Sequence, residues 1–171
     1  YKVYNGNLLY HGCVPLKEDG NLKSVRIFGR AYKGKGLYEV LESYVRKGFY
    51  AMDPKEKERG KDIMWYIWLS ENSPLFGKDK MATFERYFLA EKETHKEKKN
   101  PYYLLLEDEK VVGKILKEFG LENEDAHIIN GHVPVKCKDG ENPVKCGGKV
   151  LVIDGGFSKA YQKETGIAGY T

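Results

Sequence analysis

Apolar positions recur along this chain at spacings that predict several amphipathic helices. Between residues 36 and 48 they return at offsets of three and four, which predicts a helix ended by Gly48. The same spacing over residues 109–119 predicts a second helix, with Gly120 just beyond its end. Thr83 is a candidate N-cap for a further helix through residue 89.

Short apolar runs beside turn residues predict strands. The pair Asn5-Gly6 predicts a tight turn followed by a strand over residues 7–11, and residues 25–28 predict another strand. Further strands are predicted at residues 127–130 and, with the clearest pattern in the chain, at residues 149–154. Helices and strands are thus both expected, which indicates a mixed α and β fold.

The middle of the chain is the least regular. Residues 53–62 are highly charged and predict a solvated connection, and residues 91–100 predict an exposed helix end or loop. Residues 63–69 are apolar on all sides and too short for the periodicity to distinguish helix from strand. We expect Trp65 and Trp68 within this run to fill a core or a domain interface.

Composition indicates one folded domain rather than a disordered or membrane-spanning chain. The 171 residues are 41% hydrophobic, 32% charged and 13% aromatic. The longest apolar run, residues 63–69, is far shorter than the roughly 20 residues that cross a bilayer, so no membrane partner is expected. The formal charge is +4, but lysine and glutamate are interspersed in the charged runs, which argues against a nucleic-acid partner.

The cysteines and the chain ends bear on location and completeness. Cys13, Cys137 and Cys146 are odd in number, form no Cys-x-x-Cys pair and follow no signal peptide. Cytoplasmic location is therefore expected, and a structural zinc site is not. The sequence starts at Tyr1 instead of Met and reads as structured sequence at both ends, so we expect an internal piece of a longer protein.

Two predicted strands end in a histidine beside a glycine. One is Leu8-Leu9-Tyr10-His11-Gly12 and the other is Ile128-Ile129-Asn130-Gly131-His132. A histidine at a strand end projects into the crevice beyond a sheet, where ligands bind, and neutral imidazole is a common metal ligand. The alternative is that each histidine is only a hydrogen-bonded turn residue. His95 is expected to be solvated, and His127 to pack or cap.

These blocks resemble signature sequences of the calcineurin-like metallophosphatases. The segments 9–16 and 130–135 are similar to the fourth and fifth signature blocks of that superfamily. Within it, the segment 71–81, which contains Ser73-Pro74-Leu75-Phe76-Gly77-Lys78, and the segments 153–161 and 165–171 resemble the bacterial class III fructose-1,6-bisphosphatases. The resemblance covers nearly the whole chain and is densest over residues 63–81 and 128–171.

The resemblance implies a fold, a reaction and a metal. The fold would be α+β, part of a metallophosphatase β-sandwich flanked by helices and incomplete at its N-terminal side, with residues 1–171 as a single fragment of the catalytic domain. The reaction would be hydrolysis of the 1-phosphate of fructose 1,6-bisphosphate in gluconeogenesis, at a dinuclear centre with manganese as the usual ion. His11 and His132 would both ligate one of the two metals.

The chain also departs from the family pattern. It contains no Gly-Asn-His and no Gly-Asp-x-x-Asp-Arg, and its Asp-x-His, Asp125-Ala126-His127, lies after the His11 block instead of upstream of it. In the family the upstream blocks supply the bridging aspartate, the remaining ligands and the general-acid histidine. We therefore expect the catalytic residues upstream of Tyr1 and the isolated fragment to be inactive. The missing strands would leave an exposed surface, through which self-association is expected.

Several other side chains are candidates for substrate binding. Lys78 and Lys80 follow the Ser-Pro-Leu-Phe-Gly loop, Lys159 follows Asp154-Gly155-Gly156, and Tyr161 occupies a position where related phosphatases keep an aromatic residue near the metals. A solvated surface is the alternative for each of them. Asp154 is either a group near the metal or, more simply, a strand-end residue bonded within its own turn.

Two other functions remain open at this stage. A different metallophosphatase would keep the metal site but act on a phosphoprotein or a dinucleoside polyphosphate, which the Ser-Pro-Leu-Phe-Gly-Lys block disfavours. A non-catalytic module binding a polyanion is the alternative outside the enzymes. Its binding would weaken steeply with salt and would not depend on metal.

Overall fold

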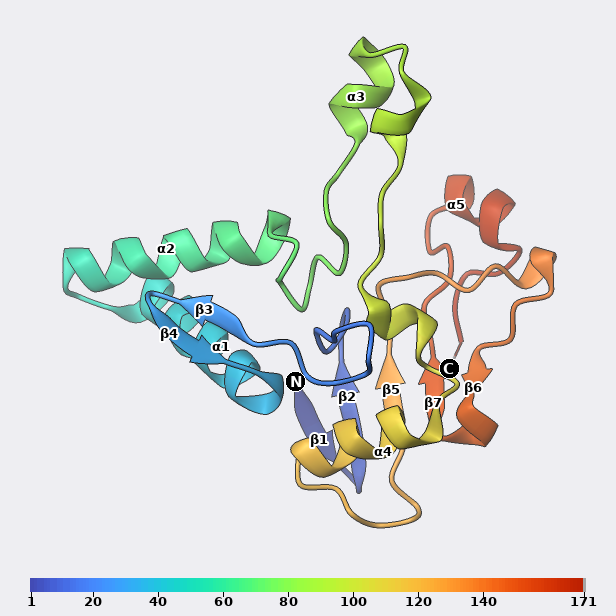
Figure 1. Ribbon diagram of the computed structural model, residues 1–171, viewed down its shortest axis with the longest axis horizontal. Helices are drawn as coiled ribbons and strands as arrows, with labels where there is room; N and C mark the ends of the chain where they lie inside the picture. The colour runs from blue at the N-terminus through green and yellow to red at the C-terminus, as the bar shows by residue number, and fades with distance from the viewer. Residues whose placement is uncertain (171) are drawn as a thin grey trace. The chain divides into compact units, whose positions relative to one another are not determined.

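The computed structural model describes residues 1–170 of the chain, which form two compact units (Figure 1). The first unit joins Tyr1–Val14 to the chain from Leu104 onward, and the second is Pro15–Tyr103. The second unit is therefore inserted in sequence between two parts of the first. The expectation of a single fragment of one catalytic domain stays a prediction.

A mixed five-stranded sheet forms the centre of the first unit. Its strands are β1 (Lys2–Tyr4), β2 (Asn7–Tyr10), β5 (Ile128–Asn130), β6 (Val144–Lys145) and β7 (Val150–Val152). The strand order is β1-β2-β5-β7-β6, and Figure 1 shows β2, β5 and β7 side by side at its centre. These three strands are parallel to one another, whereas β1 and β6 pair antiparallel at the two edges.

The first hairpin follows directly from its turn residues. Asn5 and Gly6 both have positive φ, at 49° and 75°, as the two central residues of a type I′ turn require. The turn sets the register in which Val3 faces Leu8. The strand predicted after Asn5-Gly6 is confirmed, as are those predicted at residues 25–28, 127–130 and 149–154.

Helix α4 (Glu109–Glu118) provides much of the first unit's apolar interior. The Asp108 side chain caps it by accepting from the amides of Lys110 and Val111 at 2.9 and 3.3 Å. Gly120, with φ of 81°, follows its end, so this predicted helix is confirmed. The apolar face of α4 is buried, as are alternate positions of the central strands: Val111, Val112, Ile115, Leu116, Leu8, Tyr10, Ile128, Val150 and Val152.

The remaining elements of the first unit are short. Helix α5 (Lys159–Thr165) is capped by the Ser158 side chain and ends at Gly166. Two 3-10 turns, η3 (Cys137–Asp139) and η4 (Cys146–Gly148), flank β6. All three cysteines are free: Cys13 and Cys146 are buried, and Cys137 is exposed.

The second unit is built on a helical hairpin and a small β-hairpin. Its helices and strands, in chain order, are β3 (Val25–Ile27), β4 (Arg30–Tyr32), α1 (Gly34–Tyr50), α2 (Pro54–Leu69), α3 (Thr83–Phe88) and the 3-10 turns η1 (Lys92–His95) and η2 (Pro101–Leu104), whose last residue falls in the first unit. A core joins β3 to both long helices through Val25, Ile27, Leu37, Leu41 and Ile63. Apolar burial on facing surfaces thus holds the hairpin together.

Helix α2 corrects two predictions made from the sequence. The charged stretch 53–62 is helical, not a connection, because Asp53 caps the helix with a bond to the Lys55 amide and Pro54 occupies the first turn. Helix α1 continues through Gly48 to Tyr50, so Gly48 does not end it. Gly48 instead permits close approach of α2, since a Cβ atom on Gly60 would overlap the Gly48 backbone.

Two further expectations about the second unit need correction. Trp65 and Trp68 do not fill its core, because these residues are 66% and 68% exposed on α2, and their burial in a domain interface stays a prediction. Thr83 does not cap α3: Ala82 is the N-cap, no side chain bonds there, and Thr83 is already helical. A short helix tolerates this because the Ala82 amide is bonded instead by Glu97 Oε1 at 2.8 Å.

The α+β class is confirmed by the five-stranded sheet, the two-stranded sheet and the helices. In the first unit, the described residues supply one sheet; the facing sheet of the expected sandwich is not among them. None of the helices within residues 1–170 has the length and apolar character that a bilayer crossing requires.

Candidate metal centre

Three polar side chains follow the carboxyl ends of the three parallel strands, β2, β5 and β7. His11 comes directly after β2, His132 comes two residues after β5, and Asp154 comes two residues after β7. Because the strands are parallel and adjacent, their carboxyl ends lie together, which is where ligands bind in open sheets of this kind. The fold therefore brings together residues that are up to 143 positions apart only because the strand order is β2-β5-β7.

The two imidazoles converge. His11 Nε2 and His132 Nδ1 are 3.1 Å apart, and the ring centroids are 4.9 Å apart with the ring planes at 83°. At this distance one ring nitrogen donates to the other, and the tautomers of the two rings decide which is the donor. The two rings thus lie close enough together to share one ion, as the resemblance implies. Their ligation of a metal stays a prediction.

Asp154 fixes the backbone that carries His132. Its Oδ2 accepts from the His132 amide at 2.8 Å. His132 has φ of 75°, a left-handed conformation that is costly for a residue other than glycine. The simpler expectation, that Asp154 bonds only within its own turn, is wrong: the aspartate crosses to the neighbouring strand end and holds a strained residue in place.

Asn130 and Gly12 connect the same two strand ends. The buried Asn130 donates from Nδ2 to the Gly12 carbonyl at 3.2 Å. Gly12 has φ of 89°, which turns the chain sharply after His11 and which a side chain would resist. The Asn130 Oδ1 is buried and has no hydrogen-bond partner among the described residues. Such an orphaned acceptor is costly unless a ligand, an ion or water satisfies it.

A pocket of about 560 Å³ opens beside these groups. It is lined by residues from all three strand ends and from the segment at the end of the chain, including His11, Asn130, Asp154, Phe157 and Tyr170. A smaller pocket of about 270 Å³ is lined by His132 and Tyr161. The predicted residue Tyr161 thus lies on the same pocket as one of the two histidines.

The donor set fits part of a metal site. Two imidazole nitrogens facing each other suit manganese, zinc or iron. The unsatisfied Asn130 Oδ1 is a further oxygen close by, but it is buried and not exposed to the pocket. A full coordination sphere is not present: across residues 1–170 no cluster of three or more His, Cys, Asp or Glu side chains is placed to hold an ion. These residues would supply two ligands to one ion and no complete site.

Two of the predicted lysines already have bonding partners, and the third is exposed. Lys78 and Lys80 belong to the second unit, where Lys78 pairs with Glu97 at 2.7 Å and Lys80 donates to the Thr94 carbonyl at 2.7 Å. Lys159 is exposed at the first position of α5. Their contact with substrate stays a prediction, as does that of Tyr161.

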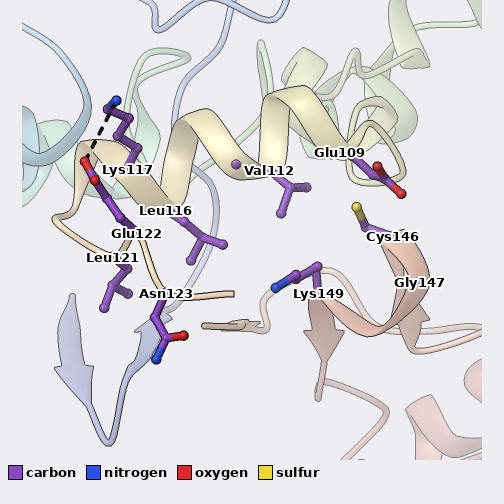
Figure 2. Close-up of a pocket in the computed structure, with 11 residues that line it drawn as sticks. Glu109, Val112, Leu116, Lys117, Leu121, Glu122, Asn123, Cys146, Gly147 and Lys149 are labelled. Carbon is purple, nitrogen blue, oxygen red and sulfur yellow. Dashed lines mark ion pairs between the residues drawn. The ribbon is translucent and has the colours of Figure 1, made fainter. Parts of the chain in front are cut away.

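A second cavity in the first unit, of about 620 Å³, lies at the opposite ends of the parallel strands (Figure 2). Val112 and Leu116 of α4 form its apolar wall, and Lys149, just before β7, projects into it and donates to the Glu124 carbonyl. Burial, and then the carboxylates of Glu109 and its neighbours, raise the pKa of the Cys146 thiol there. The cavity is larger than the histidine pocket, but the described residues that line it include no group of side chains placed to hold a metal ion.

Comparison with known proteins agrees with the geometry at the strand ends. A family model described as Firmicute fructose-1,6-bisphosphatase matches residues 1–171. The chain belongs to this family. It is 60% identical over 172 residues to the class 3 fructose-1,6-bisphosphatase of Clostridioides difficile strain 630, and 59% identical to that of Clostridium botulinum strain Hall, in each case over 100% of this chain.

The chain spans about a quarter of each of these Firmicute fructose-1,6-bisphosphatases, because the matched region is 26% of their length. No solved structure matches the chain. The resemblance read from the His-Gly and Ser-Pro-Leu-Phe-Gly-Lys blocks is thereby confirmed at the level of the family.

One residue and one contact of this site were not predicted from the sequence. Asn130 was treated only as part of a strand. Asp154 was a candidate group near the metal, but its bond to the His132 amide was not predicted. The available signal was the position of both residues at the ends of apolar runs, where parallel neighbours meet. That signal becomes specific only when the order β2-β5-β7 is known, since pattern alone gives each strand but not its neighbours.

Proposed function

We propose that the protein containing this chain hydrolyses the 1-phosphate of fructose 1,6-bisphosphate to give fructose 6-phosphate and phosphate, as a step of gluconeogenesis. The observation that carries the proposal is the 3.1 Å approach of His11 Nε2 and His132 Nδ1 at the parallel strand ends. The family membership of the whole chain supports the choice of substrate.

His11 and His132 would hold one ion of a dinuclear centre, with manganese as the preferred metal. When bound, the two ions supply Lewis acidity and an activated water for in-line attack at phosphorus. The residues of this chain would position that chemistry: Asp154 holds the His132 backbone, and Gly12 turns the chain so that the His11 ring faces its partner.

This chain by itself would be inactive. Two imidazole nitrogens cannot complete two coordination spheres, and this sequence has no Gly-Asn-His or Gly-Asp-x-x-Asp-Arg block to supply further ligands and the general acid. The chain would also self-associate, because the edge strand β1 is exposed at all three positions and carries Val3 and Tyr4 at its surface. The free state of all three cysteines fits a reducing cytoplasm.

The test uses the full-length protein with His11→Ala and His132→Ala, each compared with His95→Ala. Bound manganese is counted after metal removal and reloading, and kcat/KM is measured with fructose 1,6-bisphosphate and with a phosphopeptide. Each site variant should lose about one metal ion and at least about 100-fold in kcat/KM on the sugar substrate. His95 is the control because its Nε2 contacts only the Leu89 carbonyl in the second unit.

Two results would contradict the proposal. Full metal content in both site variants would remove the histidines from the centre. Faster hydrolysis of the phosphopeptide than of fructose 1,6-bisphosphate would keep the centre but assign another substrate class.

A further inference from the structure

A small cavity within the second unit is surrounded by lysines. Its volume is about 270 Å³, and its lining comes from residues 16–23, 71, 78–79 and 98–101. Five of its lining residues are cationic: Lys17, Lys23, Lys78, Lys98 and Lys99. Three are acidic: Glu18, Glu71 and Asp79. The cavity belongs entirely to the second unit.

Main-chain hydrogen bonds hold the walls in place. Lys78 and Lys99 pair across an antiparallel bridge, and the Asn100 amide donates to the Gly77 carbonyl at 2.9 Å. The buried Asn100 side chain accepts from the Leu16 amide at 3.1 Å and so ties the wall containing Lys17 to the wall containing Lys99. Bonds between protein groups therefore fix the positions of the cavity walls, which lowers the entropic cost of binding a ligand there.

The acidic residues of the cavity are largely engaged already. Glu18 pairs with Lys98 at 2.9 Å, and Asp79 Oδ1 accepts from the Lys98 amide at 2.8 Å. Three lysines have no ion pair or side-chain hydrogen bond among residues 1–170: Lys17, Lys23 and Lys99. None of these three lysines has an ion pair with a carboxylate, and with five lysines against three carboxylates the lining keeps a net positive charge.

Three unpaired ammonium groups line one cavity, and an anion that enters it is attracted by each of them. Each ammonium has three donors and acts as a point charge on a phosphate group. The cavity admits a compact ligand and excludes a polymer chain of many charges, because its volume is that of about nine water molecules.

We propose that this cavity binds a compact anion bearing phosphate groups. Such a ligand contacts Lys17, Lys23 and Lys99 from the two facing walls, while the Lys98–Glu18 pair closes the rim. Binding needs neither a metal ion nor the histidine pair, so the inference stands independently of the proposed hydrolytic function.

Equilibrium binding to the full-length, metal-free protein tests the proposal. Titration calorimetry with inorganic pyrophosphate should show saturable binding that the triple variant Lys17→Gln, Lys23→Gln, Lys99→Gln weakens by at least about 10-fold. The matched control is Lys55→Gln, Lys57→Gln, Lys61→Gln, which removes the same charge from the exposed surface of α2 in the same unit. The control should change the affinity by less than about twofold.

Three results would overturn the proposal: no saturable binding to the unmodified protein, equal weakening by both triple variants, or unchanged binding by the cavity variant. If the triple variant fails to fold, the single variants Lys17→Gln and Lys99→Gln replace it. Each should weaken binding about threefold, and Lys99→Arg should retain it.

Fructose 1,6-bisphosphate forms the second arm and identifies the source of the phosphate groups. If fructose 1,6-bisphosphate displaces pyrophosphate from the unmodified protein, and the triple variant binds neither, the cavity binds a sugar bisphosphate. If pyrophosphate binds but fructose 1,6-bisphosphate does not displace it, the cavity binds another phosphate-bearing anion. Either outcome supports the site. His11→Ala should leave pyrophosphate binding intact, so failure of the proposed hydrolytic function is distinguished from failure of this inference.

Discussion

Gly60 of α2 and Gly48 of α1 meet backbone against backbone. A Cβ atom built on Gly60 overlaps the nitrogen and Cα of Gly48 and the Tyr44 carbonyl. The two long helices of the second unit contact each other here through main-chain atoms, and they share a core of Leu37, Leu41 and Ile63. The contact involves main-chain atoms, so no side chain can rotate away to relieve an added methyl group.

Gly60→Ala should therefore destabilise the helical hairpin by about 1–3 kcal/mol. The measurement is chemical denaturation followed by tryptophan fluorescence. Trp65 and Trp68 are the only tryptophans and both lie on α2, so the signal reports on this hairpin. Gly36→Ala on α1 is the control, because a Cβ there meets nothing within 4 Å and the substitution should be neutral or slightly stabilising. Equal stability of the two variants would contradict the close approach.

Glu97 gives the segment around α3 an acid-dependent stability. Burial alone raises the pKa of its carboxyl, but the bonds from Lys78 and the Ala82 amide and the charges of Lys78 and Arg86 outweigh burial and lower that pKa. A carboxyl with a lowered pKa in the folded state stabilises above its unfolded pKa, near 4.5, and loses this contribution as the pH falls through the folded value.

Glu97→Gln should accordingly reduce the hydrogen-exchange protection of α3 at neutral pH, and the difference from the unmodified protein should shrink below about pH 4. Protection factors corrected for intrinsic exchange provide the measurement. Glu85→Gln, on α3 itself, is the control, because no carboxylate bond or ion pair of Glu85 occurs in the described structure. A difference that grows on acidification would show that the carboxylate does not stabilise this segment.

Asp154 should govern metal affinity through His132 without contacting the ion. Asp154→Ala removes the acceptor of the His132 amide and should weaken manganese binding to the full-length protein by about 10- to 100-fold. Asp154→Asn retains an acceptor oxygen and should recover most of the affinity. Asp125→Ala, at an exposed position of the same unit, should have no effect. Unchanged manganese affinity in Asp154→Ala would contradict this prediction, because the bond from the His132 amide to Asp154 would then have no effect on metal binding.

The cysteines should differ sharply in reactivity. Cys137 is exposed, with its sulfur 2.7 Å from the Tyr170 hydroxyl, whereas Cys13 and Cys146 are buried. Burial and then nearby carboxylates also raise the pKa of Cys146, which lowers its thiolate fraction. A maleimide should label one thiol per chain rapidly in the native state and three after denaturation. Cys137→Ser should abolish the rapid phase; its persistence would mean that a buried thiol is accessible.

Local patterns predicted most elements of this fold. The helix over residues 109–119 and the strands after Asn5-Gly6 and before Gly155 have strong periodicity and clear turn residues, and they lie where expected. Helix α2 was missed because its charged first half has no apolar periodicity. What makes that half helical is the Asp53 cap, Pro54 and the packing of Gly60 against α1, and only the cap and the proline are visible locally.

The candidate site was predicted in part. His11 and His132 were identifiable because each ends an apolar run beside glycine, and their approach follows from adjacent parallel strands. The bond from the His132 amide to Asp154 was not identifiable, since it depends on which strands are neighbours. Lys17, Lys23 and Lys99 have no motif at all. Their meeting around one cavity results from the Lys78–Lys99 bridge and the Asn100 contact, which are tertiary.

The entire second unit is inserted in sequence between β2 and β5, and yet those strands pair directly with each other. The distance between the two imidazoles is consequently set by the pairing of two adjacent strands and not by the length of the polypeptide between them. Insertions and deletions within residues 15–103 can accumulate over evolution without moving either ring. Related sequences in which this second unit differs in length would therefore keep the same spacing between the two histidines.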